Sequence, residues 1–238
     1  NTMKYIIFNW KSYLNLKESI NLSKIISRFK KSKKFKIISA PNNFFHLALS
    51  KNFKKNTYAT QNFDLDGRGA STGSLDVSHL IENKIKYTII GHSEMRSNHG
   101  ETDKIVSNKL EASINNKLIP IVCIGESLNI YKSKKTKNYL RSQINTIFKR
   151  SQKYDQIILA YEPLWSIGTG LTPELSEIDD ICKFLTKILE KYTFKKINIL
   201  YGGSVNLSNI SEILKLQFVN GVLVGSASTK SSFINYFK

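Results

Sequence analysis

The chain has 238 residues, 41% of them hydrophobic, which is enough for one sizeable core and too little for two comfortable domains. Its 36 basic residues outnumber its 18 acidic residues and give a formal charge of +18, yet only five of the basic residues are arginine. Arginine is the side chain best suited to paired contacts with bases and phosphates. An excess made of lysine is therefore weak evidence for specific nucleic-acid recognition, although it would attract an anionic substrate. We interpret the densest basic stretches, residues 28–36 and 132–137, as solvated surface.

Neither a membrane span nor a secretory leader is indicated by the sequence. No apolar run approaches the roughly 18 residues that a membrane-crossing helix needs, and residues 1–11 show no cleavage-site pattern. Cys123 lies in an apolar run and Cys182 in a helical pattern, so we expect two reduced thiols in the core. These features predict a soluble, cytoplasmic protein with no membrane partner.

Eight apolar runs rich in β-branched residues recur along the chain, and most are nearly continuous in apolar character. Such runs are typical of strands that are buried on both faces, as in a parallel sheet. The predicted strands are residues 5–9, 36–40, 57–61, 87–91, 119–124, 157–161, 197–201 and 221–225.

Apolar residues at helical spacing occupy most of the segments between these runs. The predicted helices are residues 16–29, 101–114, 139–148, 176–189, 207–214 and 231–237. Two further patterns, at 44–49 and 78–82, are short and only weakly periodic. Before the helix at 176–189, Thr172-Pro173-Glu174 predicts a helix start, with the threonine as cap and the proline at the first helical position.

Strand and helix repeated eight times predict an α/β fold, a parallel (β/α)8 barrel that residues 1–238 form as a single domain. An open doubly wound sheet is the alternative. It would normally show a glycine-rich turn after its first strand, whereas Asn9-Trp10-Lys11 contains no glycine. Residues 62–75 are the longest stretch without a pattern, and a loop of this length is usually functional or part of an interface.

Polar residues and glycines lie at or just beyond the C-terminal ends of five of the predicted strands. In a barrel of this kind the segments after the strands meet at one end, where the active site is built. They are Asn9 and Lys11 after the first strand, Gly91-His92-Ser93-Glu94 after the fourth, Glu162 after the sixth, Gly202-Gly203-Ser204 after the seventh and Gly225-Ser226 after the eighth. We expect these residues to surround one site.

The segment after the sixth strand joins a carboxylate, Glu162, to a loop that could close over it. The loop contains hinge residues and apolar cover, namely Pro163, Gly168 and Gly170, and Trp165 and Ile167. Closure would expel water and make the carboxylate a stronger base.

These side chains suit proton transfer next to a carbonyl group. Glu162 would be the base, His92 would donate a hydrogen bond to the carbonyl oxygen as it becomes an enolate, and Lys11 would add fixed positive charge. The glycine-rich turns after the seventh and eighth strands would offer backbone N–H groups to a phosphate. The spacing of the four histidines fits no metal site, so we expect neither a metal nor a cofactor.

Nine motifs occur in a specific order along the chain. They are Asn9-Trp10-Lys11, Ala59-Thr60-Gln61-Asn62, Thr72-Gly73, Gly91-His92-Ser93-Glu94, Gly100-Glu101-Thr102-Asp103, Cys123-Ile124-Gly125-Glu126, the stretch from Tyr161 to Gly170, Tyr201-Gly202-Gly203-Ser204-Val205 and Val224-Gly225-Ser226-Ala227-Ser228. Each is modest alone, but together they make the chain resemble the triosephosphate isomerase family over essentially its whole length.

That resemblance implies a TIM-barrel isomerase of glycolysis and gluconeogenesis, which interconverts dihydroxyacetone phosphate and glyceraldehyde 3-phosphate through an enediolate. It implies that Glu162 is the base, His92 the neutral electrophile and Lys11 the cation near the oxyanion. The substrate-binding residues that it implies are Asn9, Lys11, Gly168, Ser204, Gly225 and Ser226. It also implies a homodimer with the loop at 62–75 in the interface, and apolar pressure on the carboxylate from Ile167 and Leu223.

Three positions depart from the family pattern. Ser226 replaces a glycine of the phosphate turn, Met95 stands where arginine is usual, and Ser74 stands where glutamate is usual. In the family the last two positions pair across the subunit interface, so their joint change indicates an ion pair that has been replaced.

Two other functions are weighed against this one. The first is another barrel enzyme acting on a phosphorylated sugar, such as an aldolase or an epimerase. A Schiff-base aldolase needs a lysine desolvated inside a strand, and an epimerase commonly needs metal ligands; the sequence shows neither arrangement. The second is a basic nucleic-acid-binding protein.

Overall fold

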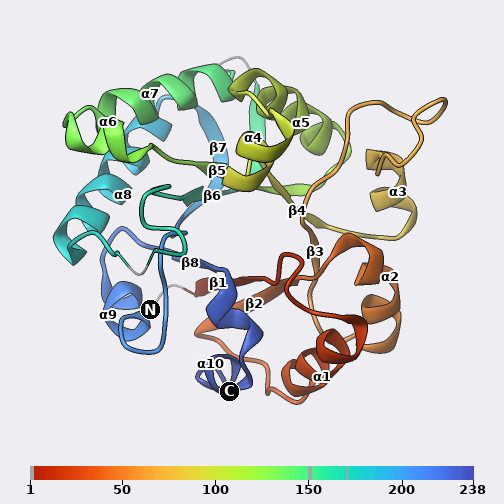
Figure 1. Ribbon diagram of the computed structural model, residues 1–238. Coiled ribbons are helices and arrows are strands. Elements are labelled where there is room, and N and C mark those ends of the chain that lie inside the picture. Colours follow the sequence, from red (N-terminus) through yellow and green to blue (C-terminus); the bar gives the residue numbers. More distant parts are fainter. Residues whose placement is uncertain (1–2, 150–151, 170) are drawn as a thin grey trace.

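The computed structural model describes residues 3–149, 152–169 and 171–238 (Figure 1). The strands are β1 (Lys4–Asn9), β2 (Phe35–Ala40), β3 (Ala59–Thr60), β4 (Tyr87–Ile90), β5 (Ile119–Ile124), β6 (Lys153–Tyr161), β7 (Thr193–Tyr201) and β8 (Gly221–Val224). The helices are α1 (Leu16–Ser27), α2 (Asn43–Asn52), α3 (Val77–Glu82), α4 (Ser93–His99), α5 (Asp103–Asn115), α6 (Leu128–Lys132), α7 (Thr136–Ile147), α8 (Leu175–Leu189), α9 (Ile210–Lys215), the 3-10 helix η1 (Ser226–Thr229) and α10 (Ser231–Asn235).

All eight strands run parallel in one sheet, in the order β2-β1-β8-β7-β6-β5-β4-β3. The two edge strands meet through a parallel bridge between Ser39 and Tyr58, and the Ser39 N–H donates to the carbonyl of Thr57 at 3.0 Å. The sheet is therefore closed, with helices around its outside (Figure 1), and the predicted (β/α)8 TIM barrel is confirmed.

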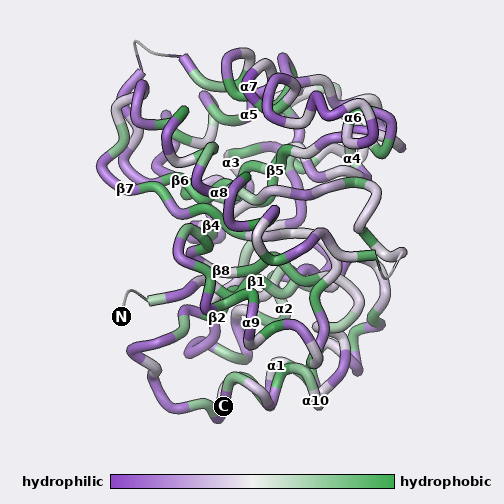
Figure 2. The backbone as a smooth tube through the Cα atoms, turned by 90° about the vertical axis from the view of Figure 1, so that its left-hand side faces the viewer, coloured by the Kyte–Doolittle hydropathy of each residue, from purple (hydrophilic) through white to green (hydrophobic). Residues whose placement is uncertain are grey.

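Strand β1 shows why the predicted strands are almost continuously apolar. Tyr5 and Ile7 belong to the cluster that fills the barrel, whereas Ile6 and Phe8 belong to the cluster between the sheet and the helices. Both faces of the strand are buried, so alternation between apolar and polar residues is lost. In Figure 2 the strands in the middle of the molecule are correspondingly green, and purple is commoner in the outer segments.

Strands β6 and β7 each begin four residues earlier than predicted, at Lys153 and Thr193. The two extensions pair with each other, and the rings of Tyr154 and Phe194 stack with centroids 4.9 Å apart. Their other face is polar and carries the ion pair of Lys195 with Asp155. A search for continuous apolar runs misses such a half-exposed extension.

The helix predictions were wrong at several places; for example, α7 begins three residues before and α9 three residues after the predicted start. Helices α4 and α6 occupy segments where no helix was predicted. The predicted start at Thr172 and Pro173 was wrong as well, because α8 begins at Leu175. The backbone N–H of Glu174 donates to the Glu177 carboxylate at 3.1 Å, so an acidic pair caps this helix in place of the threonine.

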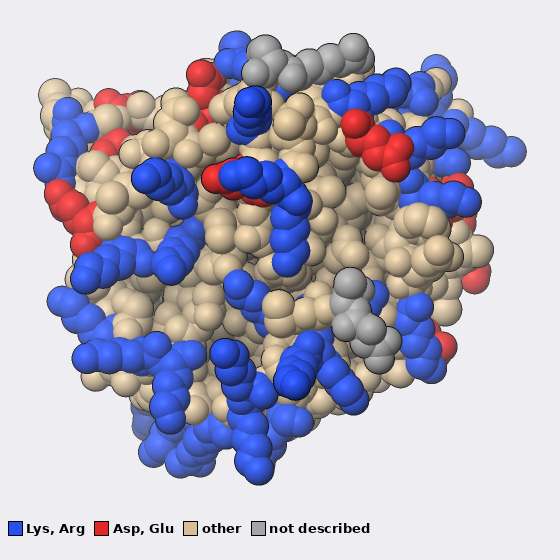
Figure 3. Space-filling model, turned by 180° about the vertical axis from the view of Figure 1, so that it is seen from behind, with Lys and Arg blue, Asp and Glu red and all other residues tan. Residues whose placement is uncertain are grey.

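Charged residues are spread over the surface. In both dense basic stretches the lysines are exposed except for Lys36, which is half-buried, as expected for solvated surface. On the face opposite to that of Figure 1, Lys and Arg are widespread and acidic side chains fewer (Figure 3). Every helix in the described ranges is too short or too polar to cross a lipid bilayer.

Candidate active site

Glu162 directly follows β6, and the surrounding backbone leaves room for its side chain. Its N–H continues the sheet by donating to the carbonyl of Ile124 at 2.7 Å, and only 2% of the residue is exposed. A Cβ atom at Gly125 would lie 1.7 Å from the Glu162 carbonyl oxygen, and one at Gly202 would lie 2.9 Å from its Cγ. These two glycines therefore allow the carboxylate to lie between neighbouring strand ends.

The two oxygens of the Glu162 carboxylate have different partners. Oε1 lies 3.3 Å from Nε2 of His92, and Oε2 accepts the backbone N–H of Ser93 at 3.2 Å. His92 caps α4, where its Nδ1 accepts the N–H of Glu94 at 3.2 Å. A neutral imidazole that accepts at Nδ1 carries its proton on Nε2, so the ring directs a donor into the site.

Lys11 reaches the same place from the turn after β1. Its Nζ lies 2.8 Å from Oε1 of Glu94, and its backbone has φ 47°, in the left-handed region. Side chains hold this conformation: Asn9 Oδ1 accepts the Lys11 N–H at 3.1 Å, and Gln61 donates to the Lys11 carbonyl at 2.8 Å. The ammonium is thereby fixed at the mouth of the barrel.

A single hollow at this end of the barrel is lined by all eight of the predicted site residues. They are Asn9, Lys11, His92, Glu162, Gly168, Ser204, Gly225 and Ser226. Ile167 and Leu223 line the same hollow, so apolar side chains lie beside the carboxylate. An acid, an imidazole and an ammonium next to three glycine- and serine-containing turns form a site that can hold an anion and move a proton.

The family model that describes triosephosphate isomerase matches residues 4–238. The chain belongs to the triosephosphate isomerase family. Its relatives include the triosephosphate isomerases of Mycoplasma mobile, 36% identical over 99% of each chain, and of Amoebophilus asiaticus, 36% identical over 94% of this chain and 93% of the other. The enzyme of Mycoplasma capricolum is 44% identical over 76% of this chain and 75% of its own.

Membership of the triosephosphate isomerase family makes the chain an isomerase that interconverts triose phosphates, which is a glycolytic reaction. It does not favour either alternative, the different phosphosugar enzyme or the nucleic-acid-binding protein.

Sequence reasoning missed Ser166, which lies in the loop after Glu162 and is fully buried. Its Oγ accepts the N–H of Ser204 at 3.1 Å, donates to the carbonyl of Leu171 at 2.6 Å and lies 3.2 Å from the Tyr201 hydroxyl. A Cβ atom at Gly203 would lie 2.9 Å from the same oxygen. The only signal in the sequence is a hydroxyl between the apolar residues of this loop.

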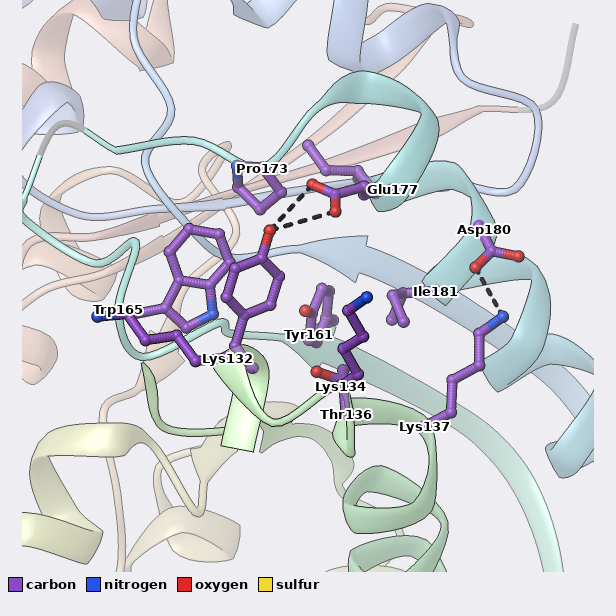
Figure 4. Close-up of a pocket in the computed structure, with 12 residues that line it drawn as sticks. Lys132, Lys134, Thr136, Lys137, Tyr161, Trp165, Pro173, Glu177, Asp180 and Ile181 are labelled. Atoms are coloured by element: carbon purple, nitrogen blue, oxygen red, sulfur yellow. Dashed lines mark hydrogen bonds and ion pairs between the residues drawn. The ribbon is translucent and has the colours of Figure 1, made fainter. Parts of the chain in front are cut away.

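The start of the same loop, which we call the lid (residues 163–172), is anchored by Trp165; the predicted hinge Gly170 lies outside the described residues. Trp165 lines a pocket that Pro173 and Glu177 also line (Figure 4). Its indole stacks on Tyr131 with centroids 4.1 Å apart and donates to Oε1 of Glu126 at 3.1 Å. Tyr161 donates to the same oxygen at 3.0 Å, and burial raises the pKa of Glu126. In this arrangement the lid is held at its first turn.

Proposed function

We propose that Glu162 is the base that moves a proton between C1 and C2 of dihydroxyacetone phosphate and glyceraldehyde 3-phosphate, through an enediolate. The observation that carries this role is the contact between the buried carboxylate and Nε2 of His92, at 3.3 Å. A carboxylate out of water is a stronger base, and a positioned base contributes about 10²- to 10⁴-fold to a rate.

His92 is the electrophile in this proposal. Its Nε2–H donates to the carbonyl oxygen of the substrate as negative charge develops there, and the bond from Glu94 N–H to Nδ1 keeps the neutral tautomer. Lys11 supplies a positive charge near that oxygen, and its contact with Glu94 restricts where the ammonium can go. These groups act without metal or cofactor in the proposed reaction.

The phosphate of the substrate is held by backbone N–H groups of Gly168, Ser204, Gly225 and Ser226, and Asn9 positions the rest of the molecule. Among the described residues, those with positive φ other than glycine are all lysines, so Ser226 needs no glycine-like backbone. The serine in place of a family glycine is therefore compatible with this turn. A lid that closes over the phosphate brings Ile167 and Leu223 onto the carboxylate and expels water.

We also propose a homodimer with the loop at residues 62–75 in the interface. Support comes from two exposed aromatic side chains, Tyr13, 57% exposed, and Phe44, 89% exposed, whose neighbour Asn43 donates to the carbonyl of Asn62 in that loop. A second hollow beside the site, lined by Tyr13, Gln61 and Met95 among others, could receive a partner's loop. Ser74 donates to Asp66 at 2.8 Å within its own loop, so this serine does not depend on a partner.

We propose a cytoplasmic location, supported by two buried cysteines that form no disulfide within the described ranges. Burial raises the pKa of both thiols, and the carboxylate of Glu162 adds to this effect at Cys123. Neutral thiols inside a core are inert.

A coupled assay of glyceraldehyde 3-phosphate isomerisation on the purified chain tests the proposed function. We expect rapid turnover in the presence of a chelator, with inorganic phosphate as a competitive inhibitor. Turnover that is absent, or that inorganic phosphate does not inhibit, would contradict the proposed site.

A further inference from the structure

The hydroxyl of Ser166 joins three segments at the edge of the hollow. It accepts from Ser204 in the turn after β7, donates to Leu171 at the far end of the lid and lies beside Tyr201 at the end of β7. Ser166 belongs to the lid itself, so one oxygen connects both arms of the lid to the turn. The residue is fully buried, and water therefore does not compete for these contacts.

One of these contacts uses a donor that the proposed substrate also needs. The N–H of Ser204 carries a single hydrogen, and at 3.1 Å that hydrogen is directed at Ser166 Oγ. A phosphate oxygen that accepts the same N–H must occupy the place where Ser166 Oγ now lies. The phosphate and the serine hydroxyl therefore exclude each other at this amide.

We propose that Ser166 is a positioning residue whose hydroxyl stands in for a phosphate oxygen at Ser204 and that substrate binding displaces it. This inference rests on the proposed function, because it takes the Ser204 N–H as a ligand of the phosphate. Displacement breaks the link between the lid and the turn after β7, so arrival of the phosphate and movement of the lid become one event. Part of the binding free energy of the phosphate therefore offsets the loss of the contact between Ser166 and Ser204.

The Ser166→Ala variant tests the proposal through inorganic phosphate. The variant leaves the Ser204 N–H free, so the Kd of inorganic phosphate, measured by titration calorimetry, should fall by about threefold to tenfold, the range of one net hydrogen bond. Thr169→Ala is the matched control. Its hydroxyl donates to the Trp165 carbonyl at 2.9 Å and accepts the Leu171 N–H at 3.2 Å, so its loss loosens the lid without freeing Ser204. Phosphate should bind this control no more tightly than the wild type.

A measurement on the wild-type chain covers the case in which Ser166→Ala fails to fold. In NMR titrations with inorganic phosphate, the amide resonance of Ser204 and the 13Cβ resonance of Ser166 should move together, with the same midpoint. Movement of Ser204 while Ser166 stays still would overturn the proposal, as would equal or weaker phosphate binding by Ser166→Ala. Phosphate that leaves the Ser204 amide unchanged in every form would instead refute the phosphate site of the proposed function, and the role of Ser166 with it.

Discussion

The backbone of Glu162 is held in place next to the end of β6, because its N–H donates to the carbonyl of Ile124 in β5. Only the side chain of Glu162 therefore reaches into the hollow. The variant Glu162→Asp withdraws the carboxylate by about 1 Å, a misplacement that can cost roughly 100-fold in turnover. We expect kcat in the coupled assay to fall by about this factor, with an unchanged circular dichroism spectrum. Glu212→Asp, at an exposed residue of α9, is the control and should behave as the wild type. Wild-type turnover by Glu162→Asp would remove Glu162 from the role of base.

His46 is a buried ring without a hydrogen-bond partner for either nitrogen in the described structure, and it packs in a T-shaped pair with Tyr58, with centroids 5.8 Å apart. Burial lowers the pKa of His46 from 6.5 to about 4. Between pH 6.5 and 4 the unfolded chain therefore binds a proton that the folded chain does not. The free energy of unfolding falls as the pH drops through this range.

Replacement of the His46 ring should remove its contribution to the pH dependence of the free energy of unfolding. For His46→Leu we expect the loss of stability between pH 7 and pH 5 to be smaller than in the wild type by on the order of 2 kcal/mol, measured by urea unfolding at both pH values. His99→Asn changes an exposed histidine and is the control. An equal loss of stability in His46→Leu and the wild type would show that His46 titrates normally in the fold.

At the scale of single residues, the sequence predicts which side chains meet but not how they are paired. Lys11, His92 and Glu162 could be collected because each follows a strand whose end faces the same mouth. The contacts of Glu94 with Lys11, and of Ser166 with Ser204, depend on rotamers and on the path of two loops. Periodic patterns in the sequence predict neither the rotamers nor the paths of the loops.

At the scale of elements, movement of the lid can be followed by tryptophan fluorescence, because one of the two tryptophans in the chain anchors this loop. Trp165 stacks on Tyr131 and donates to the Glu126 carboxylate, so we expect movement of the lid to change the surroundings of the indole. We expect glycerol 3-phosphate, which has no carbonyl and cannot react, to change the fluorescence emission of the wild type. Trp165→Phe should abolish the change. Trp10→Phe alters the other, buried tryptophan and should retain it.

The opposite pattern, with the signal lost in Trp10→Phe and kept in Trp165→Phe, would place the response in the core of the barrel. It would then contradict movement of the lid.

Segments with a continuous apolar run or a strong apolar stripe were mostly predicted well, and segments with neither were missed. The barrel strands read as apolar runs, whereas the extensions of β6 and β7 alternate with polar residues and were missed. Helices α4 and α6 have no fully buried residue among those described, so they lack the apolar stripe on which helix prediction depends. Helix α8 was placed correctly in its body because its stripe is strong, and was wrong only at its first turn.

For the whole molecule, the proposed dimer can be tested at Phe44, which exposes 89% of its surface near the start of α2. A twofold interface contains both copies of the ring, so Phe44→Asp should raise the Kd of dimerisation by about 100-fold or more, measured by sedimentation velocity. Leu207→Asp is the control, at a leucine that is 49% exposed before α9. Equal effects of the two substitutions would argue against an interface at α2.

The sequence predicts the order of the eight strands more directly than it predicts the closure of the barrel. Repetition along the chain predicts the order, since each helix returns the chain to the same end of the sheet. Closure depends on one parallel bridge between Ser39 of β2 and Tyr58, which directly precedes β3, and β3 has only two residues. The predicted strand over residues 57–61 was too long, because only Ala59 and Thr60 of that segment pair with β4.

Gly125 and Gly202 carry no functional group, yet they decide where the reactive oxygens of their neighbour can stand. A methyl group at position 125 would press on the backbone of Glu162 and one at position 202 on its side chain, so either would shift the carboxylate. The activity of this enzyme thus depends partly on the absence of side chains next to the catalytic carboxylate. Catalysis can therefore be lost by substitution at positions where no atom reacts.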